Sequence, residues 1–166
     1  MTSLYNRYAR SKKATSGQGM VVKYRKGNPS LKRQLEKKLD LKFSLYIRLR
    51  DTDENGYFQC PTCGKFKSWK SADCSHYWSR SHKATRWDED NCCVECSHCN
   101  RYDSSHLDGL GKHLKKKLGE QGFDLLNWKH NQVFKMTEFE LAQLIKEYEK
   151  KIVQLQREKN PGYNKK

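Results

Sequence analysis

Apolar residues recur every three or four positions near both ends of the chain, and this period predicts two long amphipathic helices. The first apolar stripe covers residues 31–49, and we expect its helix to start with Asn28 as the N-cap and Pro29 as the first helical residue. The last stripe covers residues 141–155, behind a capping box that Thr137 opens. Packing of these two apolar faces on each other is the simplest arrangement.

Between the two helices the pattern changes to short apolar segments separated by turns. Residues 57–59 predict a short strand, and residues 64–95 should form a hairpin. A further helix should follow from Asn100 and end at Gly119 and Gly122, because glycine is a frequent helix terminator. Helices combined with a small hairpin predict an α+β fold.

The composition indicates one domain with a small core. Hydrophobic residues make up 35% of the 166 residues and charged residues 32%. We expect a single domain over residues 29–158, a flexible arm over residues 1–28 and a disordered tail over residues 159–166. No signal peptide or membrane-spanning run is visible, which favours a cytoplasmic protein without a membrane partner.

The positive charge is concentrated at the start of the chain. Residues 1–50 carry a net charge of +12, out of +15 for the whole protein. The first 28 residues contain no acidic side chain, and tyrosines are interleaved with their basic residues. Such an arm suits the phosphates of DNA, with the alternative that it only aids solubility. The candidate DNA-binding residues are Arg7, Arg10, Lys12, Lys13, Lys23, Arg25 and Lys26.

Two CxxC pairs predict a structural zinc site. Cys60 and Cys63 form the first pair, and Cys96 and Cys99 form the second. Zn²⁺ is commonly held by four thiolates in a tetrahedron, and each CxxC turn supplies two neighbouring corners. Because the hydrophobic core is small, we expect zinc to be required for folding. The remaining cysteines, Cys74, Cys92 and Cys93, are interpreted as small buried hydrophobic residues.

Three polar residues around the cysteines predict a site for phosphodiester hydrolysis. His76 is the candidate general base, because a neutral imidazole can take a proton from water. Asn100 follows Cys99 directly and is the candidate ligand for a catalytic Mg²⁺ or Mn²⁺ ion, since hard cations prefer oxygen. Asn91 is expected to form hydrogen bonds across the hairpin that keep the His76 ring aimed.

The spacing of these motifs resembles that of the phage NinG/Rap family of recombination nucleases, a branch of the His-Asn-His endonucleases. The resemblance extends from about Tyr46 to Leu155. It rests on the His-Tyr pair at residues 76–77, the Arg-Trp-Asp-Glu-Asp-Asn run at residues 86–91, and the Cys-Ser-His-Cys-Asn run at residues 96–100. It implies a zinc-stabilised ββα-metal core flanked by helices, and metal-dependent cutting of branched DNA, including Holliday junctions and D-loops, during phage recombination.

The chain departs from the family pattern near the expected metal. Ser75 stands where many His-Asn-His enzymes carry Asp or His before the general base. Asp73 is the nearest carboxylate, but in a regular strand it faces away from His76, so we expect a bulge if it is a ligand. Asp103 and His106 could complete the metal shell, with a structural role as the alternative.

Two other functions fit part of this pattern. A non-catalytic, zinc-stabilised DNA- or RNA-binding module would explain the cysteines and the basic arm, but would not need His76, Asn91 and Asn100 at their spacing. A sequence-reading His-Asn-His nuclease would need a second DNA-reading domain, and none is apparent. The sequence leaves a homodimer open.

Overall fold

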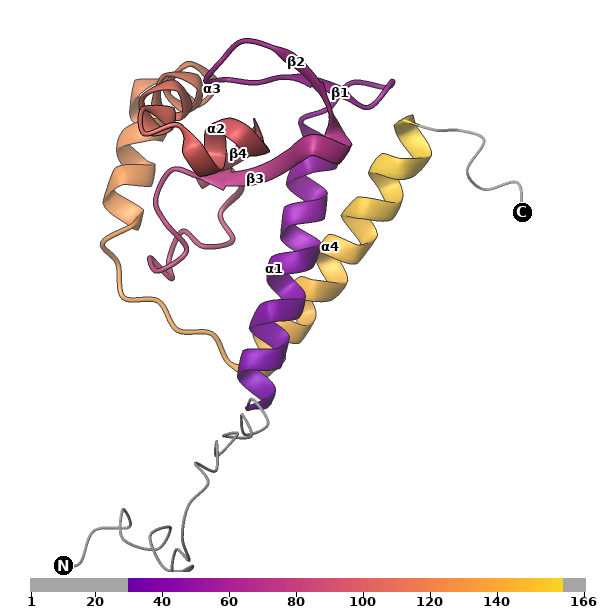
Figure 1. Cartoon of the computed structure of the whole chain (residues 1–166). Helices are drawn as coiled ribbons and strands as arrows, with labels where there is room; N and C mark the ends of the chain where they lie inside the picture. Colours follow the sequence, from indigo (N-terminus) through magenta and orange to yellow (C-terminus); the bar gives the residue numbers. More distant parts are fainter. Residues whose placement is uncertain (1–29, 160–166) are drawn as a thin grey trace, which may run out of the picture.

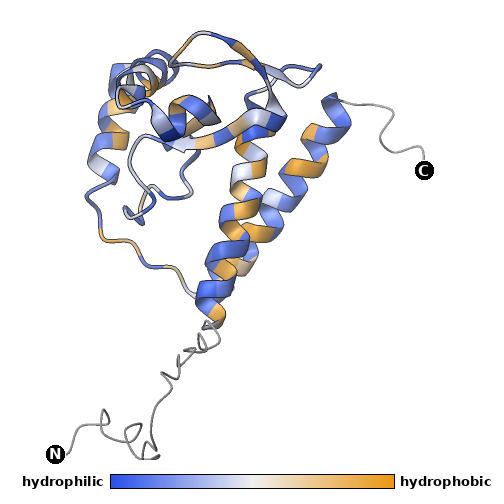
Figure 2. Cartoon of the chain, in the orientation of Figure 1, coloured by the Kyte–Doolittle hydropathy of each residue, from blue (hydrophilic) through white to orange (hydrophobic). Residues whose placement is uncertain are grey.

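Two long helices lie side by side and form the main core of the protein (Figure 1). The structure, a computed structural model, describes residues 30–159. Helix α1 covers Leu31–Arg50 and helix α4 covers Glu138–Lys159. Both helices alternate apolar and polar positions (Figure 2), and the predicted packing between them is confirmed. The buried residues of this core are Leu39, Phe43, Tyr46, Ile47, Cys92, Leu141, Ile145, Tyr148 and Ile152.

The starts of both helices are capped by hydroxyl side chains. Asn28 and Pro29, the predicted start of α1, lie outside the described residues. The helix itself begins at Leu31, with the Ser30 hydroxyl accepting a hydrogen bond from the Arg33 backbone N–H at 3.4 Å. At α4 the predicted capping box is confirmed, because the Thr137 hydroxyl accepts from the Glu140 N–H at 3.2 Å and the Glu140 carboxylate accepts from the Thr137 N–H at 2.7 Å.

Helix α4 includes one residue of the segment 159–166, which was predicted to be a disordered tail. Lys159 is its last residue, and its ammonium group donates to the backbone carbonyls of Leu49 and Thr52. This contact ties the end of α4 to the end of α1. None of the helices between residues 30 and 159 is long and apolar enough to cross a membrane.

Two small antiparallel sheets lie beside the helix pair (Figure 1). Strand β1 (Tyr57–Gln59), as predicted, pairs with β2 (Phe66–Ser68), and β3 (Ala72–His76) pairs with β4 (Cys92–Cys96). The prediction of one hairpin over residues 64–95 was therefore wrong for β2. The Cys60–Cys63 turn folds that segment back onto β1, with the Cys60 N–H donating to the Lys65 carbonyl at 3.0 Å.

The connections around these strands are short helical turns and two further helices. Two 3-10 turns, η2 (Trp69–Ser71) and η3 (Glu89–Asn91), precede β3 and β4. Helix α2 (Ser97–Tyr102) follows β4 directly, so it begins before the predicted Asn100. Helix α3 (His106–Lys129) resumes after a short turn and is interrupted, not ended, at Gly119, whose φ of 72° and ψ of 174° break the helical path. Burial of Leu126 explains why the helix continues beyond Gly119 and Gly122.

Each face of the β3–β4 hairpin packs against a different part of the protein. The register pairs His76 with Cys92 and Asp73 with Glu95, without a bulge. Cys92 belongs to the core with α1 and α4, whereas Cys93 packs on α3. The end of α1 also holds β4, because the Asp51 carboxylate accepts from the Val94 N–H at 3.0 Å. The hairpin is thereby fixed between α1 on one side and α2 and α3 on the other.

Candidate functional site

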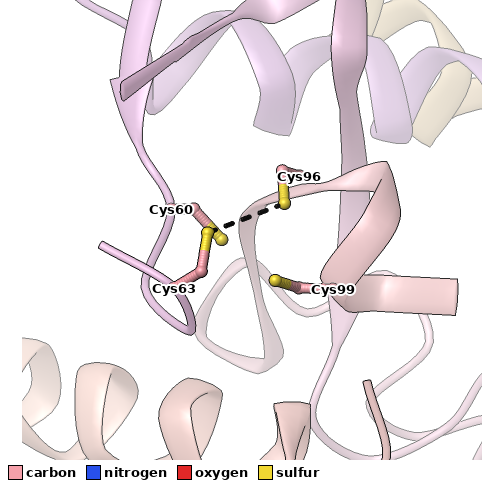
Figure 3. Close-up of side chains that lie close together, drawn as sticks. All are labelled: Cys60, Cys63, Cys96 and Cys99. Carbon is pink, nitrogen blue, oxygen red and sulfur yellow. Dashed lines mark hydrogen bonds between the residues drawn. The ribbon is translucent and has the colours of Figure 1, made fainter. Parts of the chain in front are cut away.

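The four cysteines of the CxxC pairs come together in one cluster (Figure 3). Cys60 and Cys63 lie in the turn between β1 and β2, Cys96 ends β4, and Cys99 is in α2. Their sulfur atoms all lie within 4.8 Å of one another, and the Cys63 and Cys96 sulfurs are 4.0 Å apart. A tetrahedral zinc ion with Zn–S bonds of ~2.3 Å places its sulfurs about 3.8 Å apart. The cluster could therefore hold a metal ion such as zinc.

The backbone around the first CxxC pair supports such an ion. The Gly64 N–H donates to the Cys60 carbonyl at 2.9 Å, and Gly64 has a φ of 67°, which glycine adopts without strain. The Lys65 N–H donates to the Cys63 sulfur and lowers the pKa of that thiol, which favours the metal-binding thiolate. All seven cysteines are free thiols.

A fully buried carboxylate connects this cluster to α3. Glu95 is 0% exposed, and it accepts hydrogen bonds from the Thr62 hydroxyl and from the ring of His106, whose Nδ1 lies 3.3 Å away. Thr62 lies between Cys60 and Cys63, so Glu95 fixes the first CxxC turn against the start of α3. His106 therefore has a structural partner, and it does not line the pocket described next.

A pocket of about 300 Å³ opens beside β3, between α1 and α2. It brings together three residues that the sequence singled out, His76, Asn100 and Asp73. It also contains two arginines that sequence reasoning missed. The complete lining is Asp40, Phe43, Ser44, Asp73, Cys74, His76, Arg80, Asn100 and Arg101.

The backbone carbonyl of Arg86 holds one ring nitrogen of His76. Nε2 lies 3.0 Å from the carbonyl oxygen of Arg86. A carbonyl oxygen only accepts hydrogen bonds, so Nε2 carries the proton and Nδ1 carries the lone pair of the neutral ring. Burial, assisted by the positive charge of Arg80, lowers the pKa of His76 below its usual 6.5. The ring is therefore neutral at pH 7.

Asn100 lies at the centre of a small polar network on the opposite face of β3. Its Oδ1 accepts from the Ser75 hydroxyl at 3.0 Å, and its Nδ2 donates to the Asp73 carboxylate at 3.1 Å. Arg101 donates to both oxygens of Asp73, at 2.8 and 2.9 Å. Partial burial raises the pKa of Asp73, but these hydrogen bonds outweigh it and hold the pKa below its usual value.

Strand β3 has no bulge at Asp73, so Asp73 faces away from His76, as expected for a regular strand. Asp73 and Ser75 alternate on the face that α2 covers, and this is the face on which Asn100 lies. The regular strand therefore places Asp73 next to Asn100, while His76 points toward α1, with its ring centroid 6.1 Å from that of Phe43. The side chains of Asp73 and Asn100 therefore approach the pocket from one side of β3, and the His76 imidazole approaches it from the other.

Asn91 acts on the loop between β3 and β4 and not directly on the His76 ring. It is fully buried, and its Oδ1 accepts from the Trp78 N–H at 2.8 Å. Its Nδ2 donates to the carbonyls of Trp78 and Thr85, at 2.8 and 2.9 Å. These three hydrogen bonds fold the loop that carries the Arg86 carbonyl, so Asn91 positions His76 through that loop.

Sequence reasoning missed three charged residues of this site. Asp40 of α1 accepts from the Arg86 guanidinium at 2.6 and 3.0 Å, and from the Trp87 indole at 2.9 Å. Arg80 and Arg101 supply positive charge in the pocket. Arg101 could have been noticed because it follows Asn100 directly, whereas Asp40 lies on a distant helix and carries no local signal. The predicted DNA-binding residues of the N-terminal arm lie outside the described residues.

Comparison with known proteins identifies the family. The family described as bacteriophage lambda NinG protein matches residues 4–158. No curated protein and no solved structure matches the chain at a significant level. Since the family match spans most of the 166 residues, the chain belongs to the bacteriophage lambda NinG family.

Proposed function

We propose that this protein is a metal-dependent endonuclease of the His-Asn-His type that hydrolyses phosphodiester bonds in branched DNA during phage recombination. The observation that carries the proposal is the pocket at β3, where the neutral imidazole of His76, the side-chain oxygens of Asp73 and Asn100, and two arginines line one cavity. The order of β3, β4 and α2 also agrees with the two strands and helix of a ββα-metal core.

His76 is the proposed general base. Because Nε2 donates to the Arg86 carbonyl, Nδ1 is the atom that takes a proton from the attacking water. Its lowered pKa keeps the ring unprotonated at neutral pH. The Asp40–Arg86 pair and Asn91 hold the loop that supplies this carbonyl, so both are positioning residues in the proposed mechanism.

Asn100 and Asp73 are the proposed ligands of a catalytic Mg²⁺ or Mn²⁺ ion. Both offer oxygen atoms, which these hard cations prefer, and Ser75 adds a hydroxyl to the same group. When bound, such an ion would supply positive charge to the scissile phosphate and to the departing 3′-oxygen. Asn100 is covalently attached to Cys99, so the cysteine cluster fixes the position of this ligand.

Two arginines complete the proposed pocket. Arg80 and Arg101 line it, and both guanidinium groups can donate hydrogen bonds to phosphate oxygens. Arg101 is more than half exposed, so its contact with Asp73 can be exchanged for a phosphate without great cost. The proposal thus assigns separate residues to proton transfer, metal binding and phosphate binding.

Membership in the NinG family supports branched DNA, including Holliday junctions and D-loops, as the proposed substrate. The proposed place of action is the cytoplasm of the host cell. The basic arm would add affinity for phosphates without adding sequence preference.

The decisive experiment compares cutting of a four-way junction with cutting of linear duplex of the same sequence. Purified full-length protein is incubated with Mg²⁺ or Mn²⁺, with and without EDTA. We expect junction cutting that EDTA abolishes and that His76→Ala lowers by about 10²–10⁴-fold. His98→Ala is the matched control, because His98 is an exposed histidine in the neighbouring α2.

Each alternative gives a different result. Junction binding without cutting would indicate a non-catalytic binding module. Equal cutting of junction and duplex would contradict the structural preference. A His76→Ala variant that cuts at the wild-type rate would contradict the assignment of the general base.

A further inference from the structure

Two thiols and one imidazole lie together on the α1-facing side of the β3–β4 hairpin. Cys74 and His76 share one face of β3, and Cys92 is the cross-strand partner of His76 on β4. One ligand atom from each residue lies within 4.8 Å of the others. Two thiols and an imidazole at these distances are the ligand types that bind Zn²⁺. These residues are separate from the Cys60, Cys63, Cys96 and Cys99 cluster.

The strand register favours a bridging ion over a disulfide. Cys74 pairs with Val94, so Cys74 and Cys92 are diagonal neighbours across the hairpin. Diagonal residues on adjacent strands are about 7–8 Å apart, beyond the Cα spacing of most disulfides. A zinc ion needs its sulfurs only about 3.8 Å apart. A metal ion can therefore join these side chains without moving either strand.

Cys74 and His76 can be reached from solvent and Cys92 is buried, and this combination suits a small ion. Cys74 and His76 line the pocket beside β3, whereas Cys92 is 0% exposed behind them. An ion entering the pocket therefore meets Cys74 and His76 first, and the Cys92 sulfur lies within 4.8 Å of their ligand atoms although it does not line the pocket. With three protein ligands in place of four thiolates, this site should bind zinc more weakly than the cysteine cluster.

We propose that Cys74, His76 and Cys92 form a second metal site for Zn²⁺, and that zinc bound there inhibits DNA cleavage. The inhibitory role rests on the function proposed above, whereas the site itself does not. Nε2 of His76 already donates to the Arg86 carbonyl, so the ion must bind Nδ1, the atom that would otherwise accept a proton from water.

An ion at this position would be a poor substitute for the catalytic one. Two thiolates cancel the charge of Zn²⁺, whereas the single carboxylate of Asp73 would cancel only half of the charge of Mg²⁺ or Mn²⁺, so the thiolate-bound ion is the weaker Lewis acid. The oxygen ligands Asn100 and Asp73 lie on the other face of β3. Zinc on the thiolates therefore blocks the base without supplying the charge that phosphate hydrolysis requires.

Metal binding to the full-length protein tests the site without any measurement of activity. Bound zinc is measured after dialysis against excess Zn²⁺, and Co²⁺ is titrated while thiolate-to-cobalt absorption is recorded. We expect two ions per wild-type chain, of which a weak chelator removes one. Cys92→Ala should bind one ion. Cys93→Ala should bind two, because Cys93 is equally buried but points to the opposite face.

Cleavage in Mg²⁺ then tests the inhibition. Zinc beyond the first equivalent should slow the wild type and Cys93→Ala by about 10²-fold, as expected for loss of a general base. Cys92→Ala should be unaffected. Cys74→Ala, a change at the pocket surface, gives the same test should Cys92→Ala fail to fold.

Two results would overturn the proposal. A single ion per wild-type chain in excess zinc, or a second ion that persists in both Cys92→Ala and Cys74→Ala, would refute the second site. A wild-type protein that holds two zinc ions and still cuts at its full rate would refute the inhibitory role. A protein that binds two ions but cuts no DNA under any condition would count against the proposed nuclease, not against the site.

Discussion

The Nε2 atom of His76 lies 3.0 Å from the carbonyl oxygen of Arg86, in the loop that connects β3 to β4. This contact fixes which ring nitrogen carries the proton, and it makes the histidine depend on the fold of that loop. The loop is held from two directions, by Asp40 of α1 and by the buried amide of Asn91. The position of the proposed base is thereby coupled to Asp40 and Asn91 through that loop.

The first prediction concerns the pH dependence of cleavage. Burial disfavours the imidazolium form of His76, so the pKa lies below its usual 6.5. The value of kcat/KM should rise as His76 loses its proton and reach a plateau, with the midpoint below pH 6.5. Arg80→Gln removes a positive charge that lowers this pKa, so it should move the midpoint to higher pH. Rate profiles of both proteins decide this, and an unshifted midpoint would contradict the link between Arg80 and His76.

The second prediction concerns Asn91. Asn91→Ala leaves the Trp78 N–H and the carbonyls of Trp78 and Thr85 without their partner. Leaving such buried groups unpaired should lower the free energy of unfolding by about 3 kcal/mol. Urea unfolding measures this loss, and faster hydrogen exchange at the Trp78 amide would localise it. Asn131→Ala, in an exposed turn, is the matched control and should change little.

The cysteine cluster and the two-helix core were accessible from sequence because their signals are local. Each CxxC pair is contained in one turn, and the apolar period of residues 141–155 lies within one helix. The apolar stripes of the two long helices were less reliable as predictors of burial at the ends of the stripes. Leu31 is 56% exposed, because the periodic pattern continues beyond the part of α1 that α4 covers.

The composition of the pocket was only partly accessible, because it depends on which face of β3 meets which helix. Sequence reasoning placed Asp73 opposite to His76, which is correct for the strand, but it could not tell that α2 would bring Asn100 to the Asp73 side. Asp40 pairs with Arg86 across 46 positions of sequence, and no local pattern reports such a contact.

The third prediction concerns the metal in the cysteine cluster. Cys63 is exposed, unlike Cys60, Cys96 and Cys99, so Cys63→Ser changes almost no packing. Any loss of folding must then come from lost metal. Structural zinc contributes about 10 kcal/mol, comparable with the whole stability of a domain. We expect Cys63→Ser to lose zinc and cooperative unfolding, as measured by metal analysis and circular dichroism. A folded, metal-free variant would show that zinc is dispensable.

The fourth prediction concerns the proposed catalytic metal. Asn100→Ala and Asp73→Asn should each lower Mg²⁺-dependent cutting by roughly 10²-fold, because each removes a proposed ligand of a charge-stabilising ion. Asn100→Ala should recover partly in raised Mn²⁺. Direct Mn²⁺ binding, measured by electron paramagnetic resonance, should weaken in both variants and remain unchanged in His98→Ala. Full Mn²⁺ affinity in both variants would remove Asn100 and Asp73 from the metal site.

The last prediction concerns the basic arm, which lies outside the described residues. Deleting residues 1–28 removes seven positive charges and no negative ones, while the capped start of α1 at Ser30 stays intact. We expect the truncated protein to fold, to keep its zinc and to retain the His76 chemistry, but to bind DNA more weakly. The slope of log affinity against log salt should decrease, by about 6 if all seven charges contact phosphates of duplex DNA.

The same deletion shows how the arm meets a branch point. If the arm contacts only phosphates, junction and linear duplex should lose affinity equally, because counterion release does not depend on branching. If Tyr5, Tyr8 or Tyr24 stacks on unpaired bases, junction binding should fall much further than duplex binding. Titrations of both substrates at two salt concentrations separate these cases. An unchanged salt slope would exclude the arm as a DNA contact, and cutting by the pocket residues would then have to rely on the charges of the folded domain, with Arg80 and Arg101 the first to test.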